Sequence, residues 1–198
     1  HDDIERLQQC RALVDLSLAG TGITDQSCVL LAHRKNLQVL SLSCEYRITT
    51  SCVNSFNIAS LQQLSLLDCP KVVEPIDEIL RAAPQLKVLE LAGSQFSDRS
   101  IKAASTCRCL TEIHIRNFDV SDAGLDQLSN APHLQQVFLS GTSRVTARGI
   151  AAILSRPQFR FLLWSDVGVD ELSFAELQAK QTDFVWRGTA TYARARRK

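Results

Sequence analysis

Apolar residues recur along the chain in a triplet with the spacing leucine-x-x-leucine-x-leucine. The copies begin at Leu13, Leu37, Leu61 and Leu86, and conservative variants begin at Leu110, Leu134 and Phe159. Successive copies start 24 or 25 residues apart. Seven copies at a nearly constant spacing indicate a repeat architecture, in which each copy belongs to one structural unit.

Each triplet predicts a short strand, and the segment after it predicts a turn and a helix. The alternation in Leu16-x-Leu18 is typical of a strand with one buried face. Polar residues follow the next apolar anchor, as in Ile23-Thr24-Asp25, and they can accept hydrogen bonds from the free N–H groups that begin a helix. The apolar spacing then predicts short helices over residues 123–130 and 148–154.

Units of this size must stack, because one unit of about 24 residues cannot bury its own apolar face. We therefore predict an α/β fold, a right-handed β-α solenoid shaped as an arc or horseshoe. Its parallel sheet is expected on the concave side and its short helices on the convex side.

The repeat domain is expected to span residues 1–186 and to contain about seven units. It is expected to begin inside a preceding repeat, because three early residues match the helical part of a unit: Ile4, Leu7 and Cys10. Phe184 and Trp186 are interpreted as a degenerate last strand that covers the end of the stack. Residues 187–198 are expected to form a basic C-terminal tail, and further domains of the parent chain are expected N-terminal to residue 1.

The segment Cys10-x-x-Leu13-x-x-Leu16-x-Leu18, followed by Gly22-Ile23-Thr24-Asp25, resembles the cysteine-containing subclass of leucine-rich repeats. Residues 110–128 resemble it too, and the resemblance covers roughly residues 4–186. The subclass includes the substrate-recognition parts of F-box ubiquitin-ligase receptors, scaffold and cytoskeletal proteins, and microbial effectors. The resemblance implies a leucine-rich repeat solenoid that binds other proteins through its surface. The units are shorter than is usual in the subclass, and these residues contain no F-box.

Composition and the lack of catalytic motifs restrict the classes of function that the chain can have. The 198 residues are 45% hydrophobic and 22% charged, as in an ordinary globular protein. No apolar run approaches the roughly 18 residues of a membrane span. The sequence shows no nucleophile elbow, phosphate loop or metal-ligand spacing. We therefore expect no enzymatic activity, no cofactor, no metal site and no membrane partner.

Seven cysteines cannot all pair within one chain, which favours a reducing compartment. We therefore expect an intracellular protein, cytoplasmic or nuclear, whose thiols are largely reduced. Most of the cysteines are interpreted as small buried hydrophobes. Cys44 and Cys69 are candidate neighbours in adjacent units, but no disulfide is expected between them. The tight pair Cys107 and Cys109 lacks the further ligands that a metal site needs.

Residues between and beside the strand anchors are expected to point outward on the concave face. In the first three units the side chains on this face are mostly small and without charge, as at Ser17, Ser41 and Ser65. In units four to seven it combines charged, aromatic and aliphatic residues, as binding hot spots do. The predicted partner-binding residues are Glu90, Glu112, His114, Arg116, Gln136, Phe138, Phe161 and Leu163. The alternative is that residues 187–198 cover Phe161 and Leu163.

These patterns predict a protein-interaction module that uses the concave face. It would be part of a larger scaffold or adaptor, such as the substrate receptor of a ubiquitin ligase. The alternative is a nucleic-acid-associated protein that uses the basic run from Arg194 to Lys198. The formal net charge of +1 argues against a broad phosphate-binding surface, so the protein partner is preferred.

Overall fold

Parallel strands alternate with helices along the whole repeat region. The computed structural model describes residues 6–7, 9–10, 12–32, 34–180, 184–186 and 192–195. The parallel strands are β1 (Asp15–Ala19), β2 (Val39–Ser43), β3 (Gln63–Leu67), β4 (Val88–Ala92), β5 (Glu112–Arg116), β6 (Gln136–Thr142) and β7 (Phe161–Val167). The helices are α2 (Asp25–Leu31), α3 (Thr50–Ser55), α4 (Asp77–Ala82), α5 (Asp98–Ala104), α6 (Asp122–Gln127), the 3-10 helix η1 (Leu128–Asn130), α7 (Ala147–Leu154) and α8 (Glu171–Lys180). The helices expected over 123–130 and 148–154 are confirmed as α6 with η1 and as α7.

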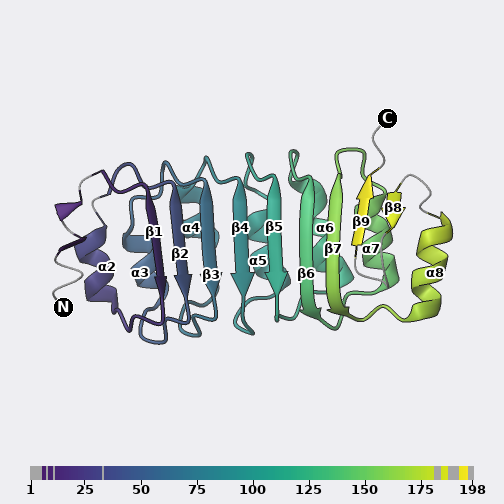
Figure 1. Cartoon of the computed structure of the whole chain (residues 1–198), viewed down its shortest axis with the longest axis horizontal. Helices are drawn as coiled ribbons and strands as arrows, with labels where there is room; N and C mark the ends of the chain where they lie inside the picture. The colour runs from purple at the N-terminus through teal and green to yellow at the C-terminus, as the bar shows by residue number, and fades with distance from the viewer. Residues whose placement is uncertain are drawn as a thin grey trace.

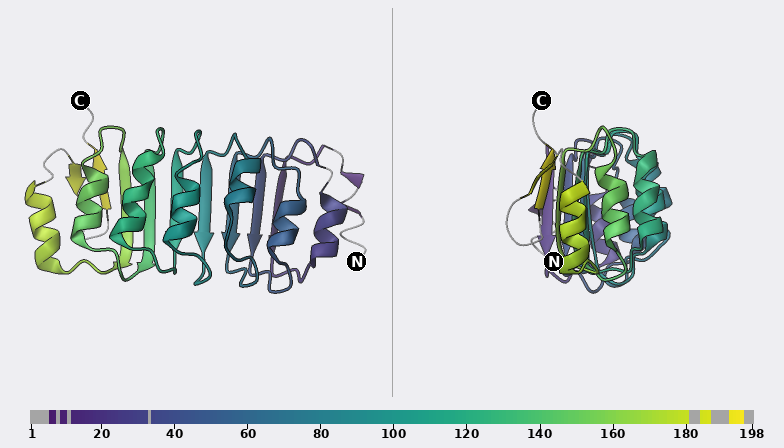
Figure 2. Two further views of the ribbon diagram at one scale, coloured as in Figure 1. Left: turned by 180° about the vertical axis from the view of Figure 1, so that it is seen from behind. Right: turned by 90° about the vertical axis from the view of Figure 1, so that its right-hand side faces the viewer.

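The elements form two layers, with the sheet on one side and the helices on the other (Figures 1 and 2). The strands β1 to β7 follow one another in the sheet in chain order, and each pairs in parallel with the next. Each crossover passes through the helical layer in a right-handed sense (Figure 1). The predicted right-handed β-α solenoid is therefore confirmed.

The strand anchors form the core because the register stacks them on one another. Leu40 pairs with Leu64 and Leu64 with Leu89 across adjacent strands. Each of these side chains is 0% exposed, as is Ile113 on the next strand. A second layer of apolar residues comes from the helices, for example Leu125 and Ile150. The core therefore runs as one cluster through the stack instead of closing within any repeat.

The C-terminal strands differ from the expectation. β8 (Phe184–Trp186) is a strand at the end of the sheet, as its apolar alternation predicts, but it does not pair with β7. β9 (Tyr192–Ala195) lies between them and pairs antiparallel with both. The free edge of β7 would otherwise present a row of unpaired N–H and C=O groups, which β9 pairs. The sheet therefore continues into residues 192–195, which were predicted to belong to a basic tail. Ile4, residues 187–191 and residues 196–198 lie outside the described residues.

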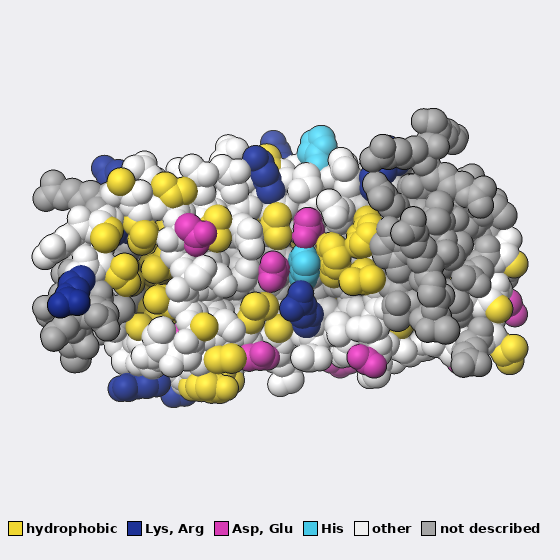
Figure 3. Space-filling model, in the orientation of Figure 1, with side chains coloured by type: hydrophobic (Ala, Val, Ile, Leu, Met, Phe, Trp, Pro, Cys, Tyr) yellow, Lys and Arg dark blue, Asp and Glu magenta, His cyan; other side chains and the backbone are white. Residues whose placement is uncertain are grey.

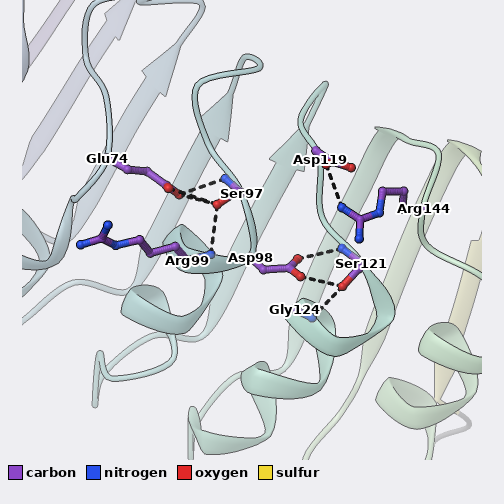
Figure 4. Close-up of polar contacts among 8 residues, drawn as sticks. All are labelled: Glu74, Ser97, Asp98, Arg99, Asp119, Ser121, Gly124 and Arg144. Carbon is purple, nitrogen blue, oxygen red and sulfur yellow. Dashed lines mark hydrogen bonds and ion pairs between the residues drawn. The ribbon is translucent and has the colours of Figure 1, made fainter.

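Carboxylates at the helix starts join each repeat to the next. Asp98, the first residue of α5, accepts hydrogen bonds from the backbone N–H of Ser121 (2.8 Å) and from its hydroxyl (2.6 Å) (Figure 4). Ser121 in turn caps α6 by accepting from the N–H of Gly124 (3.4 Å). The same two contacts join Asp25 to Thr49 and Asp122 to Thr146. We call this series of contacts the carboxylate ladder.

Two junctions build the ladder from other side chains. Glu74 takes the place of an aspartate and accepts from the backbone N–H and the hydroxyl of Ser97, both at 3.0 Å (Figure 4). Thr50 takes the place of a carboxylate before α4, where its hydroxyl accepts from the N–H of Val73 and donates to the carbonyl of Val73, both at 3.0 Å. The polar junction is therefore kept even where the acidic residue is lost.

The ladder also explains two glycines in the first turns of helices. A Cβ at Gly124 would collide with Oδ1 of Asp98, and a Cβ at Gly149 would collide with Oδ1 of Asp122. Both glycines are buried, so the chain cannot move the collision into solvent. Glycine at these positions therefore makes room for the carboxylate of the preceding repeat.

The register predicts that Leu89→Asp destabilises the protein severely. Leu89 is 0% exposed, and an unpaired carboxylate among stacked anchors should lower the free energy of unfolding by at least about 4 kcal/mol. Thermal unfolding followed by circular dichroism measures the change. Leu172→Asp is the matched control, because Leu172 on α8 is 81% exposed and should tolerate the same charge. Equal melting temperatures for the two variants would contradict the register.

The ladder predicts that Gly124→Ala and Asp98→Ala are coupled. Gly124→Ala alone should cost about 1–3 kcal/mol of stability, because its methyl group collides with the Asp98 carboxylate. In an Asp98→Ala background the same change should cost less, since the closest collision is gone, alanine favours helix over glycine, and only the Val120 side chain, 2.9 Å from the added Cβ, must still shift. A double-mutant cycle from denaturant unfolding measures the coupling. Additive effects would show that the carboxylate does not set the requirement for glycine.

Candidate functional site

The predicted partner-binding residues lie together on the sheet face over β4 to β7. Alternate residues of a strand point to the same face, and the parallel register aligns them across strands. Glu90 therefore lies opposite His114, and His114 opposite Phe138. Figure 3 shows acidic, histidine and basic side chains in the centre of this face, with a hydrophobic group beside them. All eight predicted residues belong to this area: Glu90, Glu112, His114, Arg116, Gln136, Phe138, Phe161 and Leu163.

Three polar side chains on β5 are linked in a line. Nε2 of His114 lies 2.6 Å from Oε1 of Glu112, and Nδ1 of His114 lies 3.3 Å from a guanidinium nitrogen of Arg116. A neutral imidazole with its proton on Nε2 satisfies both contacts, because it donates to the carboxylate and accepts from the guanidinium. The line fixes the orientation of the His114 ring. Arg116 keeps most of its five N–H donors for other groups.

Three rings form a row across β5, β6 and β7. The His114 ring stacks on Phe138 with the ring centroids 4.1 Å apart and the planes at 10°. Phe138 then contacts Phe161, with centroids 5.2 Å apart and the planes at 44°. Because the rings support one another, Phe138 is held at the centre of the row rather than free in solvent.

A shallow hollow of about 270 Å³ lies beside the ring row. Its apolar wall includes Phe138 and Leu163, and Leu163 is 37% exposed. Its polar wall includes Arg116 and the hydroxyls of Ser140 and Ser165, which are 3.0 Å apart. The hollow can therefore seat an apolar side chain while hydrogen-bonding donors stand at its rim.

Ser140 and Ser165 were not among the predicted site residues, although both line the hollow. They occupy the same outward column of their strands as Arg116. Their position in this column is the feature of the sequence that could have identified them as site residues. A column of outward residues does not show which of its members form a depression, so the charged, aromatic and aliphatic residues were favoured over these serines.

The N-terminal half of the same face differs in two ways. Ser17 and Ser41 lie on the surface with small neighbours, as predicted. Ser65 shares the outward column of Ser41 and Glu90 but is only 2% exposed, so neighbouring side chains on this face cover it.

Cys28 and Cys52 form a disulfide that the sequence did not predict, whereas the other five cysteines are free, as expected for largely reduced thiols. The odd number of cysteines excluded only complete pairing. The two residues lie on neighbouring helices, 24 positions apart, with a Cα–Cα distance of 5.3 Å, which is within the range that disulfides require. Cys44 and Cys69, the pair weighed from the sequence, are both free. Stacking of equivalent helix positions, rather than turn positions, brings the sulfur atoms together.

The free cysteines have contrasting surroundings. Burial raises the pKa of the Cys107 thiol to about 11, and burial is also the largest cause that raises the pKa of Cys69. Cys10 is exposed. Within the described ranges, no group of three or more His, Cys, Asp or Glu side chains is placed to hold a metal ion. No helix in the described part of the chain is long and apolar enough to cross a bilayer.

A comparison with protein families places these features in context. Residues 5–187 match the family described as the leucine-rich repeats of an FBD-associated F-box protein. The match includes all seven parallel strands and every predicted partner-binding residue.

The cysteine environments predict an order of alkylation. At about pH 8 the exposed Cys10 should react first, and Cys107 should react only after unfolding, because its raised pKa leaves little thiolate. In denaturant, five thiols should be labelled without reductant and seven after reduction. Mass spectrometry of the labelled chain counts the sites. Seven labels without reductant would exclude the Cys28–Cys52 bond, and fast native labelling of Cys107 would contradict its burial.

Proposed function

The chain belongs to the leucine-rich repeat family of FBD-associated F-box proteins, and from this premise we propose that it binds another protein on the sheet face of β4 to β7. Repeats of this family are generally interaction modules without enzymatic activity. The observation that carries the proposal is the ring row of His114, Phe138 and Phe161 beside an open hollow.

The chemistry of this face suits a binding hot spot. Aromatic residues and arginine are enriched in the centres of protein interfaces, where they are enclosed by the partner. Here Phe138 supplies the apolar anchor and Arg116 the main polar contact. Both are held by neighbours on rigid strands, so little conformational entropy is lost when a partner binds. Glu90 and Glu112 would orient the partner more than they add affinity.

The relationship to F-box proteins supports a finer proposal, that the repeats are the substrate-binding part of a ubiquitin-ligase receptor or a similar adaptor. Domains N-terminal to residue 1 would complete such a receptor. A cytoplasmic or nuclear location is part of this proposal. The five free cysteines agree with a reducing compartment, whereas the Cys28–Cys52 disulfide is unusual for a cytoplasmic or nuclear protein.

A photo-crosslinking experiment identifies the partner and maps its position. A photoreactive amino acid at Ser140, on the rim of the hollow, should capture the partner in cells. The same amino acid at Ser41, on the bland half of the face, is the control and should not. Capture from Ser41 or from the helical layer, without capture from Ser140, would place the interface elsewhere.

With that partner in hand, Phe138→Ala should weaken binding by at least about 2 kcal/mol, which is roughly thirtyfold. Isothermal titration calorimetry measures the loss. Because Phe138 also packs on His114 and Phe161, Phe138→Leu is the companion variant, which keeps an apolar group and should lose less affinity. Ser17→Ala and Ser41→Ala should bind normally. Unchanged affinity in a folded Phe138→Ala protein would refute the assignment.

A further inference from the structure

A second surface lies on the edge of the solenoid where the strands end. After each strand, one residue directly precedes a buried apolar residue of the following loop. In consecutive repeats these residues are Arg47, Lys71, Gln95, Asp119 and Arg144. The buried residues after them are Ile48, Val72, Phe96, Val120 and Val145. The parallel stack therefore places the first set in one column along the edge.

Neighbours in this column reach one another. Arg144 and Asp119 form an ion pair with a nitrogen–oxygen distance of 2.8 Å (Figure 4). Both side chains remain more than half exposed, at 58% and 61%. The pair shows that charged side chains at this position meet across one repeat spacing.

Arg47 and Lys71 are also consecutive members of this column, as Asp119 and Arg144 are, but both carry a positive charge. Within the described residues, no ion pair or hydrogen bond joins either side chain to an acidic group. The nearby Glu45 is fully buried and accepts hydrogen bonds from Thr21 and Gly22. Glu74 is engaged with the next repeat through the carboxylate ladder. Two adjacent like charges repel, so an external anion between them would be favoured.

Exposed apolar side chains flank these charges. Tyr46 is 61% exposed and Val73 is 45% exposed. Val73 stands at the position where the preceding and following repeats have Thr49 and Ser97, whose hydroxyls cap their helices. Helix α4 has no side-chain cap, so Val73 neither caps a helix nor enters the core. In Figure 3 hydrophobic and basic side chains gather at this lower edge, below the first strands.

We propose that Tyr46, Arg47, Lys71 and Val73, here called the edge patch, dock an acidic peptide segment of a partner protein. A carboxylate of the segment lies between Arg47 and Lys71, and an adjacent apolar residue packs against Tyr46 or Val73. The edge patch is separate from the ring row, so this proposal goes beyond the proposed function and does not depend on it.

The edge patch suits a peptide better than a nucleic acid. Nucleic-acid binding draws most of its affinity from several phosphate contacts along a basic surface. The edge patch offers two cations, and the next residue in the column after Lys71 is the uncharged Gln95, followed by the acidic Asp119. The edge patch combines two cations with two exposed apolar side chains, so it is complementary to a peptide in which acidic and apolar side chains alternate.

Fluorescence anisotropy with the full chain tests the edge patch. The probe is a labelled peptide in which glutamates flank a central leucine, measured at low salt. Arg47→Gln combined with Lys71→Gln should weaken binding about tenfold, since exposed charge contacts each contribute modestly. Tyr46→Ser should also weaken it, and added salt should reduce binding to the unmodified protein.

Lys102→Gln combined with Arg148→Gln is the matched control, because it removes one lysine and one arginine charge from exposed helix positions outside the edge patch. This control and Phe138→Ala should bind the peptide normally, which separates the edge patch from the ring row. The proposal is overturned by absence of peptide binding, by equal losses in the control, or by a single-stranded DNA of matched charge that binds as well as the peptide.

Discussion

A single unit of this chain has no interior of its own, and the whole structure depends on the stacking that supplies one. The strand anchors pair at intervals of 24 or 25 residues, and each is covered by the anchors of the repeats before and after it. This requirement fixes the register of every strand. Once the register is fixed, the outward residues fall into columns whether or not they contribute to stability. The ring row and the edge patch are both products of that alignment.

Polar contacts make the stacking specific. Apolar anchors alone would tolerate small slips between helices, whereas the carboxylate ladder requires a side-chain oxygen of one repeat opposite one backbone N–H of the next. Asp98 illustrates the point, because it contacts both the backbone and the hydroxyl of Ser121 and also demands glycine at position 124. Where the acid is absent, Thr50 makes equivalent contacts with the backbone of Val73. At this junction Thr50 contacts only the backbone of Val73, so the contact places no requirement on the Val73 side chain.

The sequence predicted the features that repeat and missed those that occur once. The triplet spacing located the parallel strands and two of the helices, because every copy reports the same packing requirement. The outward columns likewise placed Phe138 beside His114. The Cys28–Cys52 bond was missed because it depends on which helix positions face each other across a repeat, which the strand pattern does not specify. The antiparallel β9 was missed because pairing at an open edge leaves little trace in apolar periodicity.

Comparison of repeats within one chain separates structural from functional residues. At a given position, stacking imposes the same requirement on every repeat, so an exposed residue that departs from its column is not explained by the stack. Val73 in the column of Thr49 and Ser97 is such a departure, and so is Phe138 beside the small residues of the first strands. Val73 lies on the edge where the strands end, three repeats before Phe138, which lies on the sheet face. Stacking accounts for neither side chain, so each is a candidate for contact with a partner.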